Sequence, residues 1–266
     1  MTFERRTIRA TVEFEGLGLH SGERVSIRVH PGSVGIGFRQ GSERWQATPE
    51  NVTSTARCTA IGGISTVEHL MAALAGSEVT DVEIEVEGGE VPALDGSAAP
   101  FVAAFQRVGF ETIGHAEAPD LFQRVFALRD ESKIAISKGT GHWRAEYRCE
   151  PRWPGAQVFE TIDVNSDFPT QIAPARTFAH HDEVAAIRAA GLGLGLDESS
   201  ALVLGEAGYV NEARFPDEPA RHKLLDLIGD LYLAGVPIRL LNVSAARSGH
   251  SVNVQAARLL RGQIGA

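Results

Sequence analysis

The order of strand-like and helix-like segments constrains this chain more than any single motif does. Apolar and polar residues alternate over residues 7–13 and 24–29, which is the period of a half-buried strand. A helical segment at 65–76, an alternating segment at 82–86 and a helical segment at about 97–108 follow. The first part of the chain therefore reads as strands, helix, strand and helix.

The second part of the chain repeats this order. It is predicted to contain strands near 123–128, 133–137, 143–149 and 158–164, a helix at about 218–234 capped by Asp217, a strand at 238–243, and a helix at 250–261 closed by Gly262. A chain of 266 residues is long enough for two domains of ordinary size. We therefore predict an α+β fold of two similar layered domains, residues 1–114 and 120–266, each with a sheet and two helices.

Two such domains are expected to pack helix against helix, so that the helices lie between the two sheets. The facing helices would be those near residues 69 and 222. The segment 176–205 fits neither domain, because it holds only a short helix (about 181–190) and a glycine-rich turn (191–195). This segment either forms a wall of a binding site or is a surface insertion without a role in binding.

Composition excludes several classes of function. The net charge of −9 argues against a nucleic-acid-binding surface. No apolar run reaches the roughly 18 residues of a membrane-spanning helix, and the first residues lack the apolar core of a secretory signal. Cys58 and Cys149 form no paired motif. We expect a cytoplasmic protein, with a monomer favoured.

The helix predicted at 218–234 carries a polar stripe. His222, Asp226 and Asp230 recur at steps of four residues, opposite a stripe of apolar residues. Two ligands four residues apart on a helix are close enough to share one metal ion, and an imidazole with a carboxylate suits zinc. The alternative is a solvated stripe with a His–Asp pair, which is the more common meaning of this spacing. A zinc site also needs a third ligand.

His69 is the best candidate for that third ligand, because it lies in the first turn of its helix. Glu68 beside it has two interpretations. It is placed to act as a general base, but Ser65 three residues earlier makes it equally the end of a capping box. The local pattern alone favours the cap. His250 is either a general acid or a polar loop residue.

Five segments along the chain match the sequence pattern of a known enzyme family. They are GLGLHSG (16–22), STVEHLMAALAG (65–76), EVPALDGSAAPFV (90–102), RHKLLDLIGDLYLAG (221–235) and SGHSVNVQAARLL (248–260). Together they resemble the UDP-3-O-acyl-N-acetylglucosamine deacetylases of lipid A synthesis. The resemblance runs in order over nearly the whole chain, and it implies two layered α+β domains with the active site and one zinc ion at their interface.

The resemblance also implies roles for individual residues. His69, His222 and Asp226 match the metal ligands, and Glu68 matches the base that activates water, against the capping interpretation. The remaining matches are His250 as a cation or acid oriented by Asp230, Thr177 as the hydroxyl that stabilises the oxyanion, Lys223 and Arg247 near the substrate diphosphate, and Phe178 and His20 as further substrate-binding residues.

The segment 176–205 departs from the family pattern, in which it builds a hydrophobic passage for the 3-O-acyl chain. His180 and His181 stand where large apolar residues are usual, and Leu196 and Asp197 stand where small residues are usual. Burying a charge beside an acyl chain costs several kcal/mol unless the charge is paired. These side chains must therefore face away from the passage or mark a different ligand.

The expected function is zinc-dependent deacetylation of a UDP-linked N-acetylglucosamine, with the 3-O-acyl form as the default substrate. One alternative is a related deacetylase that acts on UDP-N-acetylglucosamine or another N-acetyl sugar without a long acyl chain. The other alternative is a zinc-binding homologue without catalytic activity, against which the presence of Glu68, Thr177 and His250 argues.

Overall fold

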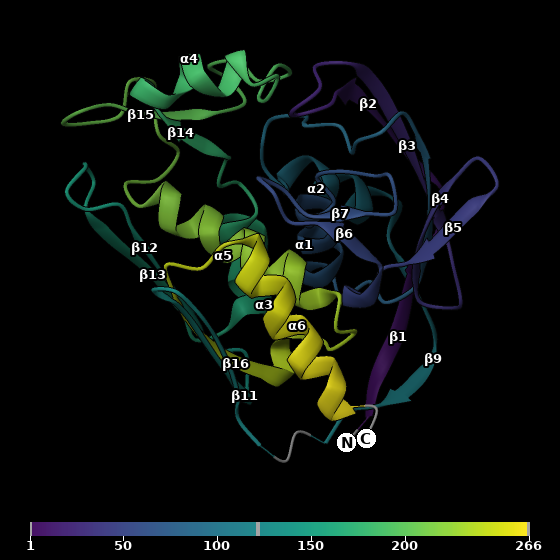
Figure 1. Ribbon diagram of the computed structural model, residues 1–266. Coiled ribbons are helices and arrows are strands. Elements are labelled where there is room, and N and C mark those ends of the chain that lie inside the picture. Colours follow the sequence, from purple (N-terminus) through teal and green to yellow (C-terminus); the bar gives the residue numbers. More distant parts are fainter. Residues whose placement is uncertain (1, 121–122, 265–266) are drawn as a thin grey trace.

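The computed structural model describes residues 2–120 and 123–264. Two five-stranded sheets flank a layer of helices, as Figure 1 shows. This arrangement confirms the predicted α+β class with helices between two sheets. The longer helices of that layer are α1 (Glu68–Gly76), α2 (Ala99–Val108), α5 (Glu218–Tyr232) and α6 (His250–Ile264).

The two sheets share one topology. In each sheet the central strand is the one that precedes a long helix: β8 before α2 and β16 before α6. Each central strand is antiparallel to one neighbour and parallel to the other. The first sheet has the order β2 (Val12–Leu17), β3 (Arg24–Pro31), β8 (Val82–Glu87), β4 (Ile36–Gln40) and β5 (Glu43–Gln46). The second has the order β10 (Val125–Arg129), β11 (Ser132–Lys138), β16 (Leu241–Ala246), β12 (Trp143–Arg148) and β13 (Ala156–Thr161).

Shorter elements connect these layers. Small two-stranded ladders pair β1 (Thr2–Ile8) with β9 (Phe110–Glu117), β6 (Val52–Ser54) with β7 (Ala60–Ile61), and β14 (Phe178–His180) with β15 (Leu202–Leu204). The other short helices are η1 (Pro49–Asn51), α3 (Val164–Asp167), η2 (Phe168–Ile172), α4 (His181–Ala189) and η3 (Ile238–Leu240). Within the described ranges, no helix has the length and apolar character needed to cross a membrane.

The helices α1 and α5 cross at a very close approach. Leu70 and Met71 of α1 and Leu224 and Ile228 of α5 are fully buried in the core. A Cβ atom added to Gly229 would lie 2.0 Å from the backbone oxygen of Glu68, so only glycine allows this crossing. The crossing brings the N-terminal turn of α1 against the middle of α5.

Several predicted boundaries are wrong. Residues 7–13 are not one strand, because β1 ends at Ile8 and β2 begins at Val12 after the Arg9 N–H donates to the Gly109 carbonyl. Residues 238–240 form a 3₁₀ turn before β16, and α6 continues past Gly262. The polar stretch near 114–119 holds the end of β9. The domain limits themselves stay a prediction.

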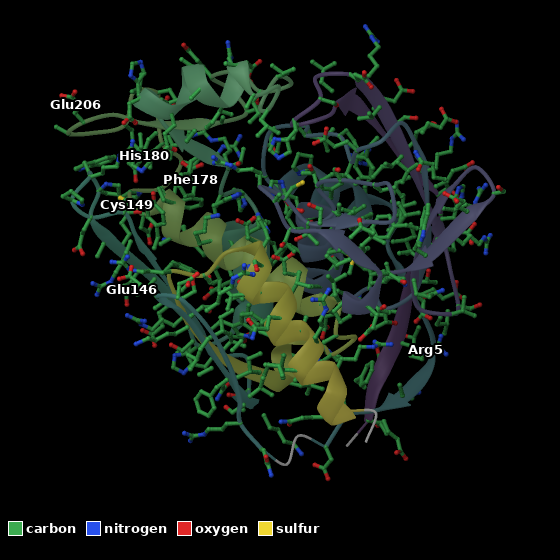
Figure 2. The ribbon with its side chains drawn as sticks, viewed as in Figure 1. Arg5, Glu146, Cys149, Phe178, His180 and Glu206 are labelled. Carbon is green, nitrogen blue, oxygen red and sulfur yellow. The ribbon has the colours of Figure 1, made fainter. Side chains whose placement is uncertain are left out.

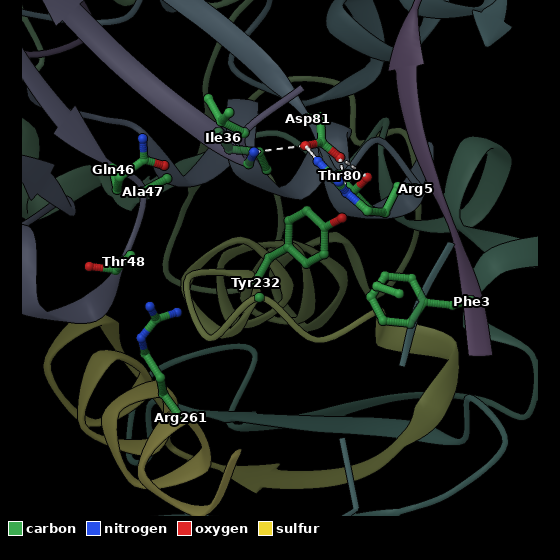
Figure 3. A pocket seen from close by; sticks show the side chains of 14 residues that line it. Phe3, Arg5, Ile36, Gln46, Ala47, Thr48, Thr80, Asp81, Tyr232 and Arg261 are labelled. Atoms are coloured by element: carbon green, nitrogen blue, oxygen red, sulfur yellow. Dashed lines mark hydrogen bonds and ion pairs between the residues drawn. The ribbon is translucent and has the colours of Figure 1, made fainter. Parts of the chain in front are cut away.

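A cavity of about 430 Å³ lies between β1, the β4–β5 hairpin and the C-terminal ends of α5 and α6 (Figure 3). Phe3, Ile36 and Tyr232 line it together with the ion pair between Arg5 and Asp81. None of the site residues predicted from the sequence lines this cavity, so the candidate site lies elsewhere.

Candidate active site

His69, His222 and Asp226 meet where α1 crosses α5. One ligand atom from each lies within 4.8 Å of the others. The Nε2 atoms of His69 and His222 are 3.5 and 3.4 Å from Oδ1 of Asp226. All three side chains are buried, with at most 4% of each residue exposed. This burial rules out the solvated stripe that was the alternative interpretation of the spacing.

The chemistry of this cluster fits a divalent metal ion. Asp226 Oδ1 is buried and finds no hydrogen-bond donor among the described residues. Burial lowers the pKa of His222 to about 3, so its ring is neutral, and its Nδ1 donates to the Ala175 carbonyl at 3.1 Å. The Nε2 lone pair of His222 is therefore free to bind a metal. A cation bound by both imidazoles would also satisfy the orphaned carboxylate oxygen.

Lys223 compensates the negative charge of Asp226 on its other side. Its Nζ donates to Asp226 Oδ2 at 2.8 Å. Burial opposes the charged form of Asp226, but the positive charge of Lys223 and a hydrogen bond from His69 hold the pKa of its carboxyl well below the usual range. Asp226 is therefore ionised and ready to bind a cation.

Glu68 does not cap its helix. The first residue of α1 is Glu68 itself, and the residue before it, Val67, provides no side-chain cap, so the capping box with Ser65 is wrong. Instead, Glu68 Oε2 accepts the backbone N–H of Thr59 at 2.9 Å, and the side chain lines the same cavity as the three candidate ligands. Burial raises the pKa of Glu68. A carboxylate with a raised pKa beside a metal site suits a general base.

His250 faces this site from the start of α6. Its Nδ1 lies 3.0 Å from Oδ2 of Asp230. Asp230 is fully buried and also accepts from the Thr59 hydroxyl at 2.5 Å and the Asn253 amide at 3.0 Å. Burial opposes the charged form of His250, but Asp230 and Glu68 raise its pKa to about 9. His250 is therefore a cation at neutral pH.

The Asp230 charge should set the upper pH limit of activity. Because Asp230 keeps His250 protonated up to about pH 9, the alkaline limb of kcat/KM is expected near that value if cationic His250 is needed. Asp230→Asn removes the charge that raises this pKa, so the limb should move to lower pH by about one unit or more. Asp217→Asn, at the residue that precedes α5, is the control. An alkaline limb that stays in place in Asp230→Asn would contradict this role.

The site opens into a cavity of about 300 Å³ with two chemically different ends. His20, Glu68, His69, His222, Lys223, Asp226 and His250 form the polar end. Leu19, Phe178, Ala179, Ile187, Leu192, Gly193, Leu196 and Ala201 form the apolar end, and Arg57 and Thr177 also line the cavity. The segment 176–205 therefore forms a wall of this cavity and is not merely a surface insertion.

The structure brings most of the predicted substrate residues to this cavity. His20, Thr177, Phe178 and Lys223 line it, and the Phe178 ring packs edge-on against His222. Arg247 does not line it; its guanidinium is paired with Glu131. The predicted position of Arg247 beside a substrate in this cavity is therefore not observed.

The polar residues that depart from the family pattern, His180, His181 and Asp197, do not line the cavity. His180 bonds through Nε2 to the Tyr147 hydroxyl at 3.2 Å, and Figure 2 labels it beside Phe178. Asp197 accepts hydrogen bonds from Ser199 and Ser200, which lower its pKa to about 2. Among the residues that differ from the family pattern, Leu196 does line the cavity, and its side chain is apolar. The apolar end therefore keeps its character.

Comparison with known proteins gives the family. The profile of the UDP-3-O-acyl N-acetylglycosamine deacetylase family matches residues 5–261. The chain belongs to this family. A family member named UDP-3-O-acyl-N-acetylglucosamine deacetylase from Xanthomonas oryzae pv. oryzae is 37% identical over 97% of this chain and 90% of its own length. One of the same name from Geobacter sp. (strain M21) is 34% identical over 94% of this chain and 86% of its own length.

Three residues near the candidate active site were not predicted from the sequence: Thr59, Asn253 and Arg57. Thr59 bonds to both Glu68 and Asp230, and Asn253 bonds to Asp230. Asn253 follows His250 by three residues on α6, a spacing that places both on one face of the helix. Arg57 lies in a loop between β6 and β7, where no periodic pattern indicates its direction.

Proposed function

We propose that this protein is a zinc-dependent deacetylase that hydrolyses the N-acetyl group of UDP-3-O-acyl-N-acetylglucosamine. The observation that carries the proposal is the buried cluster of His69, His222 and Asp226, with its orphaned carboxylate oxygen, beside Glu68. Family membership and the names of the relatives support the same reaction. The products are acetate and a free glucosamine amine, in a step of lipid A synthesis.

His69, His222 and Asp226 would hold the metal ion, which would supply Lewis acidity toward water and the amide carbonyl. Glu68 takes the proton from the attacking water. Thr177, which lines the same cavity, donates a hydrogen bond from its hydroxyl to the oxyanion that forms at the former carbonyl. Cationic His250 or protonated Glu68 then delivers a proton to the departing amine nitrogen as the C–N bond breaks.

The apolar end of the cavity supports an acylated substrate. Ile187, Leu192 and Leu196 offer apolar surface, whereas His180 and Asp197 are bonded elsewhere. An acyl chain gains about 0.8 kcal/mol for each methylene group that it buries on such a surface. We therefore expect kcat/KM for the 3-O-acyl nucleotide sugar to exceed that for UDP-N-acetylglucosamine by at least about 100-fold.

Deacetylation assays on both nucleotide sugars with zinc-loaded protein test this expectation. Leu196→Asp places a charge in the apolar end and should reduce the preference for the acylated substrate. Glu198→Gln, a change at an exposed residue of the same segment, is the matched control. Equal turnover of both substrates would favour a deacetylase of non-acylated sugars, and no turnover of either would favour a zinc-binding protein without catalytic activity.

A further inference from the structure

Two of the five segments that match the family contribute few side chains to the candidate active site. Of the predicted site residues, the segment 16–22 contains only His20, and the segment 90–102 contains none. The structure brings these two segments together. Glu90, the first residue of the second segment, is hydrogen bonded to residues 18–22, which lie between β2 and β3 and are called the His20 loop below.

Glu90 is a buried acid that forms no ion pair with any described residue. Only 3% of it is exposed. Its Oε1 accepts the backbone N–H of His20 at 2.9 Å and the hydroxyl of Thr66 at 2.7 Å. Its Oε2 accepts both the backbone N–H and the hydroxyl of Ser21, at 3.1 and 2.9 Å. Because a buried carboxylate is costly unless hydrogen bonds compensate it, all four bonds are expected to persist in the folded protein.

The local backbone is built around this carboxylate. A Cβ atom added to Gly18 would collide with Glu90 Oε2 and with Ser21 Oγ, so only glycine fits at this position. Thr66 has a φ of 59°, which is costly for a β-branched residue and persists only where the surroundings impose it. The hydroxyl of Thr66 is the group that bonds to Glu90. Glu90 therefore fixes the His20 loop relative to the residues that lead into α1.

The His20 loop forms part of the wall of the active-site cavity. Leu19 and His20 both line this cavity. The Nδ1 atom of His20 is buried and has no hydrogen-bond partner among the described residues, so a polar group of a ligand could bond to it. The carbonyls of Leu19 and His20 accept the N–H groups of Gly195 and Leu194, both at 3.2 Å, in the glycine-rich turn that follows α4 (Figure 1). Moving this loop would therefore disturb both ends of the cavity.

We propose that Glu90 is a positioning residue for deacetylation and that it acts by holding His20 against the bound nucleotide sugar. This role rests on the proposed function. Glu90 does not itself line the cavity, so it acts through the loop and not on the substrate. The three candidate metal ligands lie on α1 and α5, and the groups that bond to the Glu90 carboxylate lie on neither helix. Metal binding should therefore not depend on Glu90.

Kinetics of Glu90→Gln test this role, because glutamine keeps the shape of the side chain but turns one acceptor oxygen into a donor. We expect kcat/KM for the acylated nucleotide sugar to fall by at least about 10-fold while the zinc content stays unchanged. Glu87→Gln, the same change at the exposed end of β8, is the matched control and should keep the wild-type kcat/KM.

A double-mutant cycle with His20→Ala separates positioning from a merely structural role. Once His20 is removed, Glu90→Gln should lower kcat/KM by at most about twofold further, because the residue through which it acts is gone. Losses that multiply in the double variant would show that Glu90 does not act through His20. A wild-type kcat/KM in His20→Ala would overturn the proposal as well.

Amide hydrogen exchange of the zinc-loaded full chain tests the positioning without any chemistry. The N–H groups of His20 and Ser21 should exchange at least about 10-fold faster in Glu90→Gln than in the wild type or in Glu87→Gln. Unchanged exchange would overturn the proposal.

A second variant covers the case in which thermal unfolding shows that Glu90→Gln does not fold. Ser21→Ala removes one donor and leaves the carboxylate, so it should speed exchange and lower kcat/KM in the same direction by a smaller factor. Ser21→Ala with wild-type exchange and kcat/KM would then overturn the proposal. A wild type that releases no acetate from either nucleotide sugar would contradict the proposed function, whereas the exchange rates would still report whether Glu90 holds the loop.

Discussion

Replacing Glu68 with glutamine is expected to lower kcat by about 100-fold or more while the protein keeps its metal. The amide oxygen of glutamine can still accept the N–H of Thr59, so the start of α1 should stay in place. What the variant loses is the ability to take a proton from water. Assays of acetate release and elemental analysis of the same preparation measure both effects.

The exposed Glu111 of β9 provides a matched control, since Glu111→Gln makes the same chemical change far from the site in sequence. This control should retain wild-type kcat and metal content. If Glu68→Gln kept more than about a tenth of the wild-type kcat, Glu68 would not be the base. Loss of metal in Glu68→Gln would instead indicate that this residue supports the ligands.

Replacing Asp226 with asparagine is expected to remove most of the bound zinc and, with it, nearly all activity. Asp226 brings the negative charge of the cluster, and its Oδ1 atom lies within 3.5 Å of both histidine Nε2 atoms. Removing even an outer partner of a metal ligand costs about 10–100-fold in metal affinity, so the loss of a ligand should cost at least as much. Zinc content after dialysis against a chelator measures the change.

Asp217→Asn is the control, because Asp217 immediately precedes α5, pairs with Arg221 and does not line the site cavity. It should retain about one zinc per chain. An Asp226→Asn variant that also retained about one zinc per chain after the same dialysis would show that the ion binds elsewhere. In that case His69 and His222 would have to be tested separately.

Local patterns in the sequence predict much of this fold, because the helix or strand that a segment forms depends largely on residues within that segment. Local signals in the sequence located α1 and α5, and the spacing of four residues placed His222 and Asp226 on one face of α5. The third candidate ligand, His69, lies more than half the chain earlier, and its approach depends on how the two helices pack. Spacing alone could suggest His69 only as a candidate, and the resemblance to the family made the set specific.

Where one local pattern has two physical explanations, the sequence does not choose between them. Ser65 and Glu68 have the spacing of a capping box, but the Thr59 N–H, which reaches Glu68 through the tertiary fold, takes the carboxylate instead. Similarly, His180 and Asp197 looked like polar additions to an apolar passage. Tyr147, which reaches His180 through the packing of the fold, and Ser199, which bonds to Asp197 within the same turn, hold these two side chains outside the cavity.

The close crossing of α1 and α5 has a consequence for the order of events during synthesis. A growing chain carries His69 and Glu68 long before His222 and Asp226 leave the ribosome. Because α1 supplies only one of the three candidate ligands, His69, α1 alone cannot form the metal site. Gly229, against the Glu68 carbonyl, lets the two helices dock closely enough for the ligands to meet. Binding of a metal ion by all three candidate ligands therefore requires that the second half of the chain has docked on the first.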